Sequence, residues 1–192
     1  MSLLKEAGLA DSVLNDPDSL IPWDKTSFLL ELAAEKLNRP SLGLEWALNV
    51  PDQFPNLGPT ILIAQFVENG REWVAAVMRY WRNHTNAFVL HLFDDGVSEH
   101  IVYRYEFDAA MLASRQQVEY YLGTATRLSR VVGAAPDENP VLVRFKHSRP
   151  ADTSLHDRLF RCPIEFDAPH NEFVLERRLL DFQIHGSLKN FK

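Results

Sequence analysis

The sequence AFVLHLFDDGVSEHIVYRYEF, residues 87–107, decides the fold class of this protein. Apolar and polar side chains alternate on both sides of an acidic turn, which is the pattern of two antiparallel strands joined as a hairpin. A two-residue turn at Asp95 and Gly96 pairs Leu90 with Ile101. The segment therefore predicts an antiparallel sheet.

One face of this predicted hairpin is apolar and suits a protein core. It carries Phe88, Leu90, Leu92, Ile101, Tyr103 and Tyr105. On the mixed face the predicted register places His91 opposite His100. Two facing imidazoles would offer two metal ligands, but no third ligand stands nearby at a recognisable spacing. A half-exposed sheet face is the favoured interpretation, and we predict no metal site.

The sequence segments before and after the hairpin show helical periodicity. Leu30, Ala33, Ala34 and Leu37 form one apolar stripe of a helix that begins near Pro22. Further helices are expected at residues 41–48, 70–84, 116–132 and 153–160, with a helix start at 177–181. Strands are expected at residues 141–145, 164–166 and 172–175, and the apolar segment 58–67 is expected to be buried.

These elements predict an α+β fold in a single domain, with several helices packed on an antiparallel sheet built from hairpins. The length of 192 residues suits one domain better than two. We divide it into consecutive parts: an N-terminal segment (1–22), a helical part (23–85), the hairpin (86–107), a long helix (108–135), strands and short helices (140–182) and the start of a linker (183–192).

Charge and composition exclude several classes of protein. Twenty Lys and Arg against 26 Asp and Glu give a net charge of −6, which argues against this chain alone binding a phosphate backbone. No apolar run approaches the roughly 20 residues of a membrane helix. The N-terminus carries acids and lacks the apolar core of a signal peptide, so we expect a cytoplasmic protein.

No catalytic constellation is readable. The chain lacks a GxSxG elbow and a glycine-rich phosphate loop, and it has only eight glycines. The single cysteine, Cys162, has no base at a suitable helical spacing, so a small buried apolar residue is favoured over a nucleophile. We therefore expect neither an enzyme nor a cofactor.

An aromatic set offers a ligand site instead. A pocket between the helix at 70–84 and the apolar hairpin face would place aromatic rings around a small molecule, with a cationic side chain as polar anchor. The candidate ligand-binding residues are Trp73, Arg79, Tyr80, His91, Tyr103 and Tyr105, and Arg104 is a further candidate anchor. For any one ring, a place in the ordinary core remains the alternative.

Several segments together resemble the N-terminal effector domain of AraC-type bacterial transcription regulators, a family labelled arabinose-binding. They are LLKEAGLADSVLNDPDSLIP (3–22), ELAAEKLNRPSLGLEWAL (31–48), GPTILIAQF (58–66), WVAAVMRYWRNHTNAFVLHL (73–92), VRFKHSRPAD (143–152) and FRCPIEFDAPHNEFVLERRLLD (160–181). Their order and spacing carry the resemblance.

The resemblance implies a domain that binds a small-molecule effector, forms a homodimer and modulates an attached helix-turn-helix domain. That basic domain is missing here, so DNA is a partner only through it. No sugar-binding signature is readable, and the family label does not set the ligand. The alternatives are a stand-alone small-molecule or protein-interaction module with no DNA role and, third, an enzyme with unrecognised chemistry.

Overall fold

The computed structural model describes residues 2–16, 19–53, 66–108, 113–133 and 136–184. A five-stranded sheet in the order β1-β2-β5-β3-β4 forms its base, and only the β3–β4 pair is parallel. The strands are β1 (Phe88–Phe93), β2 (His100–Phe107), β3 (Leu142–Arg144), β4 (Ile164–Glu165) and β5 (Asn171–Glu176). The predicted α+β class with a largely antiparallel sheet is confirmed.

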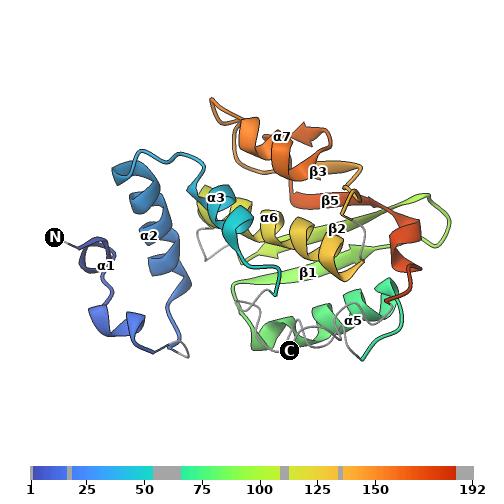
Figure 1. Cartoon of the computed structure of the whole chain (residues 1–192), viewed down its shortest axis with the longest axis horizontal. Coiled ribbons are helices and arrows are strands. Elements are labelled where there is room, and N and C mark those ends of the chain that lie inside the picture. The colour runs from blue at the N-terminus through green and yellow to red at the C-terminus, as the bar shows by residue number, and fades with distance from the viewer. Residues whose placement is uncertain (1, 17–18, 54–65, 109–112, 134–135, 185–192) are drawn as a thin grey trace.

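Helices account for most of the remaining chain (Figure 1). The α-helices are α1 (Leu3–Glu6), α2 (Trp23–Lys36), α3 (Leu42–Asn49), α5 (Gly70–Tyr80), α6 (Arg115–Val132) and α7 (Ser154–Phe160). The 3-10 helices are η1 (Asp11–Leu14), η4 (Trp81–Asn83) and η5 (Arg177–Leu180). The predicted helices and strands thus all occur, within a few residues of the expected bounds. Most of the apolar segment 58–67 lies outside the described residues.

The predicted hairpin register is wrong by four residues. Leu90 pairs with Tyr105 rather than Ile101, and His91 pairs with Arg104 rather than His100. The strands are joined by residues 94–99, because the Asp95 carboxylate accepts hydrogen bonds from the backbone of Val97 at 2.9 Å and of Ser98 at 2.8 Å and so holds a wider loop. A shift of four preserves the two faces, because successive side chains alternate across a strand.

Helix α6 lies at the centre of the fold, between the sheet and α3 (Figure 1). The apolar residues Val118, Leu122, Leu128 and Val132 of this helix are buried. Polar residues on its other sides are buried as well, namely Gln116, Gln117, Glu119, Thr124 and Thr126. A helix that is enclosed on several sides must satisfy these groups with partners from other elements.

The contact between α3 and α6 is close. A Cβ atom on Gly43 would lie 2.0 Å from the carbonyl oxygen of Gln116, so only glycine fits there. The Gln116 side chain accepts a hydrogen bond from the Gly43 amide at 2.7 Å and donates one to the Pro40 carbonyl at 2.8 Å. These bonds fix the N-terminal end of α6 against the chain that enters α3.

Helix α2 packs beside the N-terminal end of α6. Ser27 donates to the Gln117 side chain, and the Glu31 carboxylate accepts from the Gln116 amide at 3.0 Å. In the predicted stripe of this helix Ala33 and Ala34 are buried, whereas Leu37 at the helix end is 55% exposed. In Figure 1, α1 and α2 extend from one side of the body formed by the sheet, α5 and α6.

Candidate functional site

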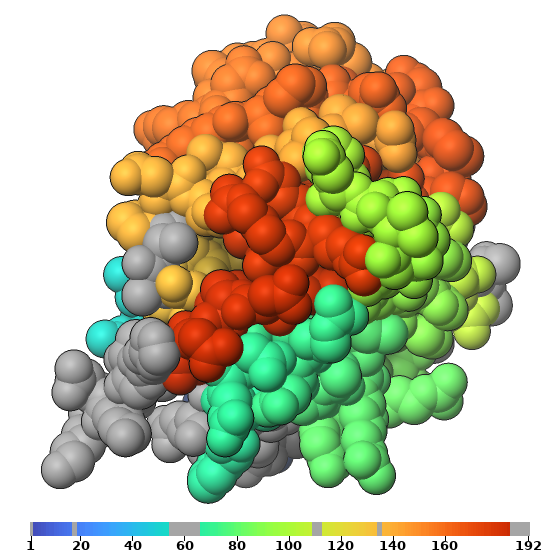
Figure 2. Space-filling view, turned by 90° about the vertical axis from the view of Figure 1, so that its right-hand side faces the viewer, coloured from blue at the N-terminus to red at the C-terminus, as the bar shows by residue number. Residues whose placement is uncertain are grey.

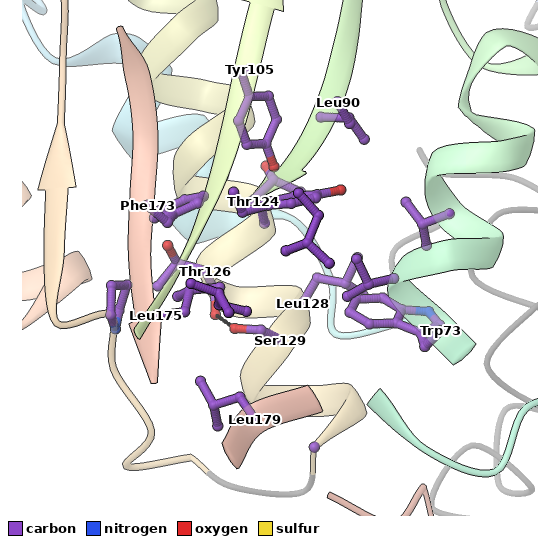
Figure 3. Close-up of a pocket in the computed structure, with 18 of the residues that line it drawn as sticks. Trp73, Leu90, Tyr105, Thr124, Thr126, Leu128, Ser129, Phe173, Leu175 and Leu179 are labelled. Carbon is purple, nitrogen blue, oxygen red and sulfur yellow. Dashed lines mark hydrogen bonds between the residues drawn. The ribbon is translucent and has the colours of Figure 1, made fainter. Parts of the chain in front are cut away.

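A cavity of about 450 Å³ lies between the inner face of the sheet, α5 and α6, with η5 at one end (Figure 3). This volume falls within the range of small-molecule sites in proteins. Its walls are mostly aromatic and aliphatic. The lining includes Trp73, Val77, Trp81, Leu90, Leu92, Ile101, Tyr103, Tyr105, Tyr121, Leu128, Phe173, Leu175, Leu179 and Phe182.

The sheet wall is built by the inward-facing residues of three strands. Tyr103 and Tyr105 are two apart on β2 and so point to the same side; their rings meet edge to face at 5.6 Å. The Phe173 ring lies 6.0 Å from that of Tyr105, and the Tyr105 hydroxyl points into the cavity (Figure 3). Burial raises the pKa of both tyrosines, so each stays a neutral hydroxyl.

The α5 wall begins at a capped helix end. The Asn69 side chain accepts a hydrogen bond from the Glu72 amide at 2.9 Å, as the N-cap residue of a helix does. From that start, Trp73 and Trp81 reach the cavity. His84 also lines it, and burial lowers its pKa, which favours the neutral imidazole. This wall therefore contributes rings without a fixed charge.

The α6 wall supplies hydroxyl groups. Thr126 donates to the Leu122 carbonyl at 3.0 Å, and Ser129 donates to the Thr126 carbonyl at 2.9 Å (Figure 3). The Thr124 hydroxyl oxygen is buried, and within the described part of the chain it has no hydrogen-bond partner. A buried polar group without a partner is costly, so Thr124 is free to bind a group that enters the cavity.

The end of the cavity is closed by the last described segment of the chain. Figure 2 shows this segment, in red, lying against α5. The Gly70 amide donates to the Phe182 carbonyl at 3.1 Å, and the Ile184 amide donates to the Glu68 carbonyl at 2.8 Å. A Cβ atom on Gly70 would lie 2.3 Å from the Leu179 carbonyl oxygen. The segment is thus bound directly to the start of α5.

Charges lie at the rim of the cavity. Arg178 and Glu138 line it, and they pair with each other at 3.0 Å while Arg178 also contacts Glu176. The Arg178 side chain is 63% exposed. This ion pair joins η5 to the chain that precedes β3, on the side where the cavity meets the surface.

The structure brings together three of the six predicted site residues. Trp73, Tyr103 and Tyr105 line the cavity, on the two elements expected. Tyr80 is 46% exposed, because α5 ends there and Trp81, in the following 3-10 turn, takes the inward position. The Arg79 guanidinium lies 5.8 Å from the centre of the Tyr80 ring and does not line the cavity.

The predicted cationic anchors lie elsewhere on the fold. His91 faces the opposite side of the sheet, where its Nε2 lies 2.8 Å from Glu106. Arg104 is on that same face and donates to Glu172 at 2.8 Å. Alternation along each strand places both residues away from the ring-lined face.

Sequence reasoning missed the threonine and serine hydroxyls of α6 and the contribution of the final segment. Ser129 lies within the predicted helix at 116–132 and shares a helical face with Leu122 and Val132, so its small polar side chain among larger apolar ones is a signal for a cavity. Thr124 sits beside that stripe and carries no comparable signal. Leu179 and Phe182 reach the cavity only because residues 177–184 return to the start of α5, which no local pattern shows.

The described residues contain no group of three His, Cys, Asp or Glu side chains placed to hold a metal ion. None of the helices in the described ranges is both long enough and apolar enough to cross a membrane. Cys162 contacts the core, and burial raises the pKa of its thiol to about 11.

Comparisons with known proteins agree with one another. Residues 1–184 match the family described as the arabinose-binding domain of AraC transcription regulators, N-terminal. Among solved structures, the crystal structure of the transcriptional regulator CdpR from Pseudomonas aeruginosa is similar, with a TM-score of 0.64 and 15% sequence identity over 95% of this chain. This chain spans only 55% of the length of that one. Among proteins with curated functions, none matches.

Proposed function

Because this chain belongs to the arabinose-binding domain family of AraC transcription regulators, we propose that it binds a small-molecule effector in the cavity between β2, α5 and α6 and thereby controls an attached DNA-binding domain. The observation that carries this proposal is the cavity of about 450 Å³, which is lined by rings and has a buried hydroxyl at Thr124 that finds no partner among the described residues. A packed core leaves few voids larger than a water molecule.

The contacts of the final segment offer a route for regulation. Leu179 and Phe182 line the cavity, and the same segment is hydrogen-bonded to Glu68 and Gly70 at the start of α5. An effector that contacts Leu179 would favour one arrangement of this segment over another. If the effector binds one arrangement of the segment more tightly, its binding raises the population of that arrangement. The position of a domain attached to the segment would change with it.

In this proposal the domain acts in the cytoplasm as part of a homodimeric regulator. The net charge of −6 supports the assignment of effector binding to this domain and of phosphate contacts to a separate basic domain. The length of the CdpR chain, of which this chain covers 55%, is consistent with such an addition.

The test is a screen of neutral and charged small molecules for compounds that raise the melting temperature. Hits are then measured against Ser129→Trp, which adds a large ring at a position that lines the cavity, and against Tyr80→Phe, which changes an exposed ring outside it. We expect Ser129→Trp to abolish the shift and Tyr80→Phe to retain it. Hits that are indifferent to Ser129→Trp would place the effector elsewhere and contradict the proposal.

The regulatory step has its own measurement. Hydrogen exchange at the Gly70 and Ile184 amides, which donate between α5 and the final segment, should change when a hit binds. Exchange at the Gly43 amide, which donates to Gln116 on the other side of α6, serves as the internal control. Unchanged exchange at Gly70 and Ile184 with a bound hit would overturn the route through this segment.

A further inference from the structure

We infer that the effector is a neutral, largely apolar molecule that carries a hydrogen-bond acceptor facing Tyr105 and Thr124, and is neither a sugar nor an anion. This inference rests on the proposed function, since it takes the cavity as the effector site. It concerns the chemical class of the ligand. The family description names only a sugar, arabinose.

The walls argue against a sugar. The rings of Trp73, Tyr103 and Phe173 and the side chains of Leu90 and Leu128 surround the space. Each hydroxyl of a sugar loses its bonds to water on entry and needs a partner in the protein. Two of the hydroxyls in the α6 wall, those of Thr126 and Ser129, already donate to backbone carbonyls. The indole N–H groups of Trp73 and Trp81, which are buried and have no partner among the described residues, can only donate, so few acceptors remain for the hydroxyls of a polyol.

The charges argue against an anion. Of the described cations near the cavity, Arg178 alone lines it, and it lies at the rim in contact with both Glu138 and Glu176. Arg104 is bound to Glu172 on the opposite face of the sheet. A carboxylate inside the cavity would therefore lose its hydration without gaining a counter-ion, which is strongly unfavourable.

The hydroxyls select for an acceptor. Tyr105 lines the cavity and points its hydroxyl into it (Figure 3). The Thr124 hydroxyl is buried and unpartnered within the same described ranges. Both groups are neutral donors, so a carbonyl or ether oxygen between them would satisfy both. The edge-to-face pair of Tyr103 and Tyr105 also suits a flat aromatic ligand.

Four probes separate these ligand classes. Acetylnaphthalene is neutral with one carbonyl acceptor, isopropenylnaphthalene is its apolar isostere, naphthoate is the matching anion, and arabinose represents the sugars. Binding is measured by equilibrium dialysis on the whole chain. We expect acetylnaphthalene to bind roughly threefold to tenfold tighter than its isostere, as one hydrogen bond allows, and more than about tenfold tighter than naphthoate. Arabinose is expected to show no saturable binding.

Isosteric variants locate the acceptor. Tyr105→Phe and Thr124→Val each remove a hydroxyl without opening space, and together they should erase the preference for acetylnaphthalene over isopropenylnaphthalene. Tyr80→Phe removes an exposed hydroxyl outside the cavity and should leave the preference unchanged. Retention of the preference in the double variant, checked for an intact melting transition, would overturn the assignment of these two residues.

The two proposals fail in different ways. Tight binding of naphthoate or arabinose that is blocked by Ser129→Trp would overturn the ligand class and leave the cavity as the effector site. Binding of the probes that Ser129→Trp does not affect, or no binding of any probe while effectors from the screen bind outside the cavity, would overturn both.

Discussion

The Nε2 atom of His156 lies 3.0 Å from Oε1 of Glu119, and neither side chain is exposed to solvent. Glu119 is on α6 and His156 on α7, so this contact joins two helices through the core. The Nε2 atom of His147 lies 3.6 Å from the same carboxylate oxygen, and the Phe145 and Phe166 rings surround both imidazoles. A polar cluster thus supports the N-terminal end of α6.

Removal of the Glu119 carboxylate should destabilise the fold strongly. Glu119→Ala leaves His156 buried without a partner, and the loss of unfolding free energy should be roughly 2–5 kcal/mol. Glu119→Gln keeps the shape and one acceptor, so its loss should be smaller. Urea unfolding of the three proteins measures the difference. Equal stability of Glu119→Ala and the parent chain would mean that the pair contributes nothing.

Acid should destabilise the protein through its buried histidines. Burial lowers the pKa of His147 from 6.5, and the nearby Arg115 and His156 lower it further. A hydrogen bond with the Ser148 backbone and the charge of the Glu119 carboxylate raise this pKa but do not cancel the effect of burial. His147 is thus more easily protonated in the unfolded chain. Its contribution to stability is complete above about pH 6.5 and is lost as the pH falls toward the native-state pKa. Burial also lowers the pKa of His84, so His84 contributes to the loss of stability in acid in the same way.

The measurement is urea unfolding at about pH 7.5 and about pH 5.5, a range in which histidines dominate the titration. We expect lower stability at the acidic value and a smaller difference between the two in His147→Gln. His100→Gln, at an exposed position, serves as the matched control substitution. Greater stability at the acidic pH than at the neutral pH would contradict the predicted direction of this pH dependence.

Leu122 tests the central position of α6. Its side chain is fully buried, with an exposed fraction of 0%, so Leu122→Ala should cost roughly 2–5 kcal/mol of unfolding free energy. Leu37→Ala, at a position that is 55% exposed, should change stability by less than about 0.5 kcal/mol. A loss below about 1 kcal/mol at Leu122 would mean that this side of α6 is loosely packed.

Cys162 should react slowly with thiol reagents. Because burial raises the pKa of its thiol from 9.0 to about 11, the fraction of thiolate at neutral pH should be about a hundredfold lower than in a free cysteine. Labelling by a chromogenic disulfide reagent should therefore be slow in the native chain and fast in urea. Similar rates in the two conditions would show that the thiol is open and ionised.

Local patterns predicted the elements but not all of their pairings. The alternation in residues 87–107 identified the two strands and assigned Tyr103 and Tyr105 to the inner face, which the structure confirms. The register was wrong because the Asp95 side chain holds a longer loop than the sequence suggests. The assignment of side chains to the two faces of the hairpin stayed correct only because the register shift was an even number of residues.

The sequence by itself determined the periodicities and the fold class, since these depend on side chains that are neighbours along one strand or one helix. The order and spacing of its segments indicated the family. The tertiary structure alone decided that residues 177–184 close the cavity and that Arg79, Tyr80 and His91 lie outside it. It also decided that Thr124 lines this cavity without a hydrogen-bond partner among the described residues. Contacts between residues about a hundred positions apart, such as Gly70 with Phe182, depend on how finished elements pack, and no local pattern records them.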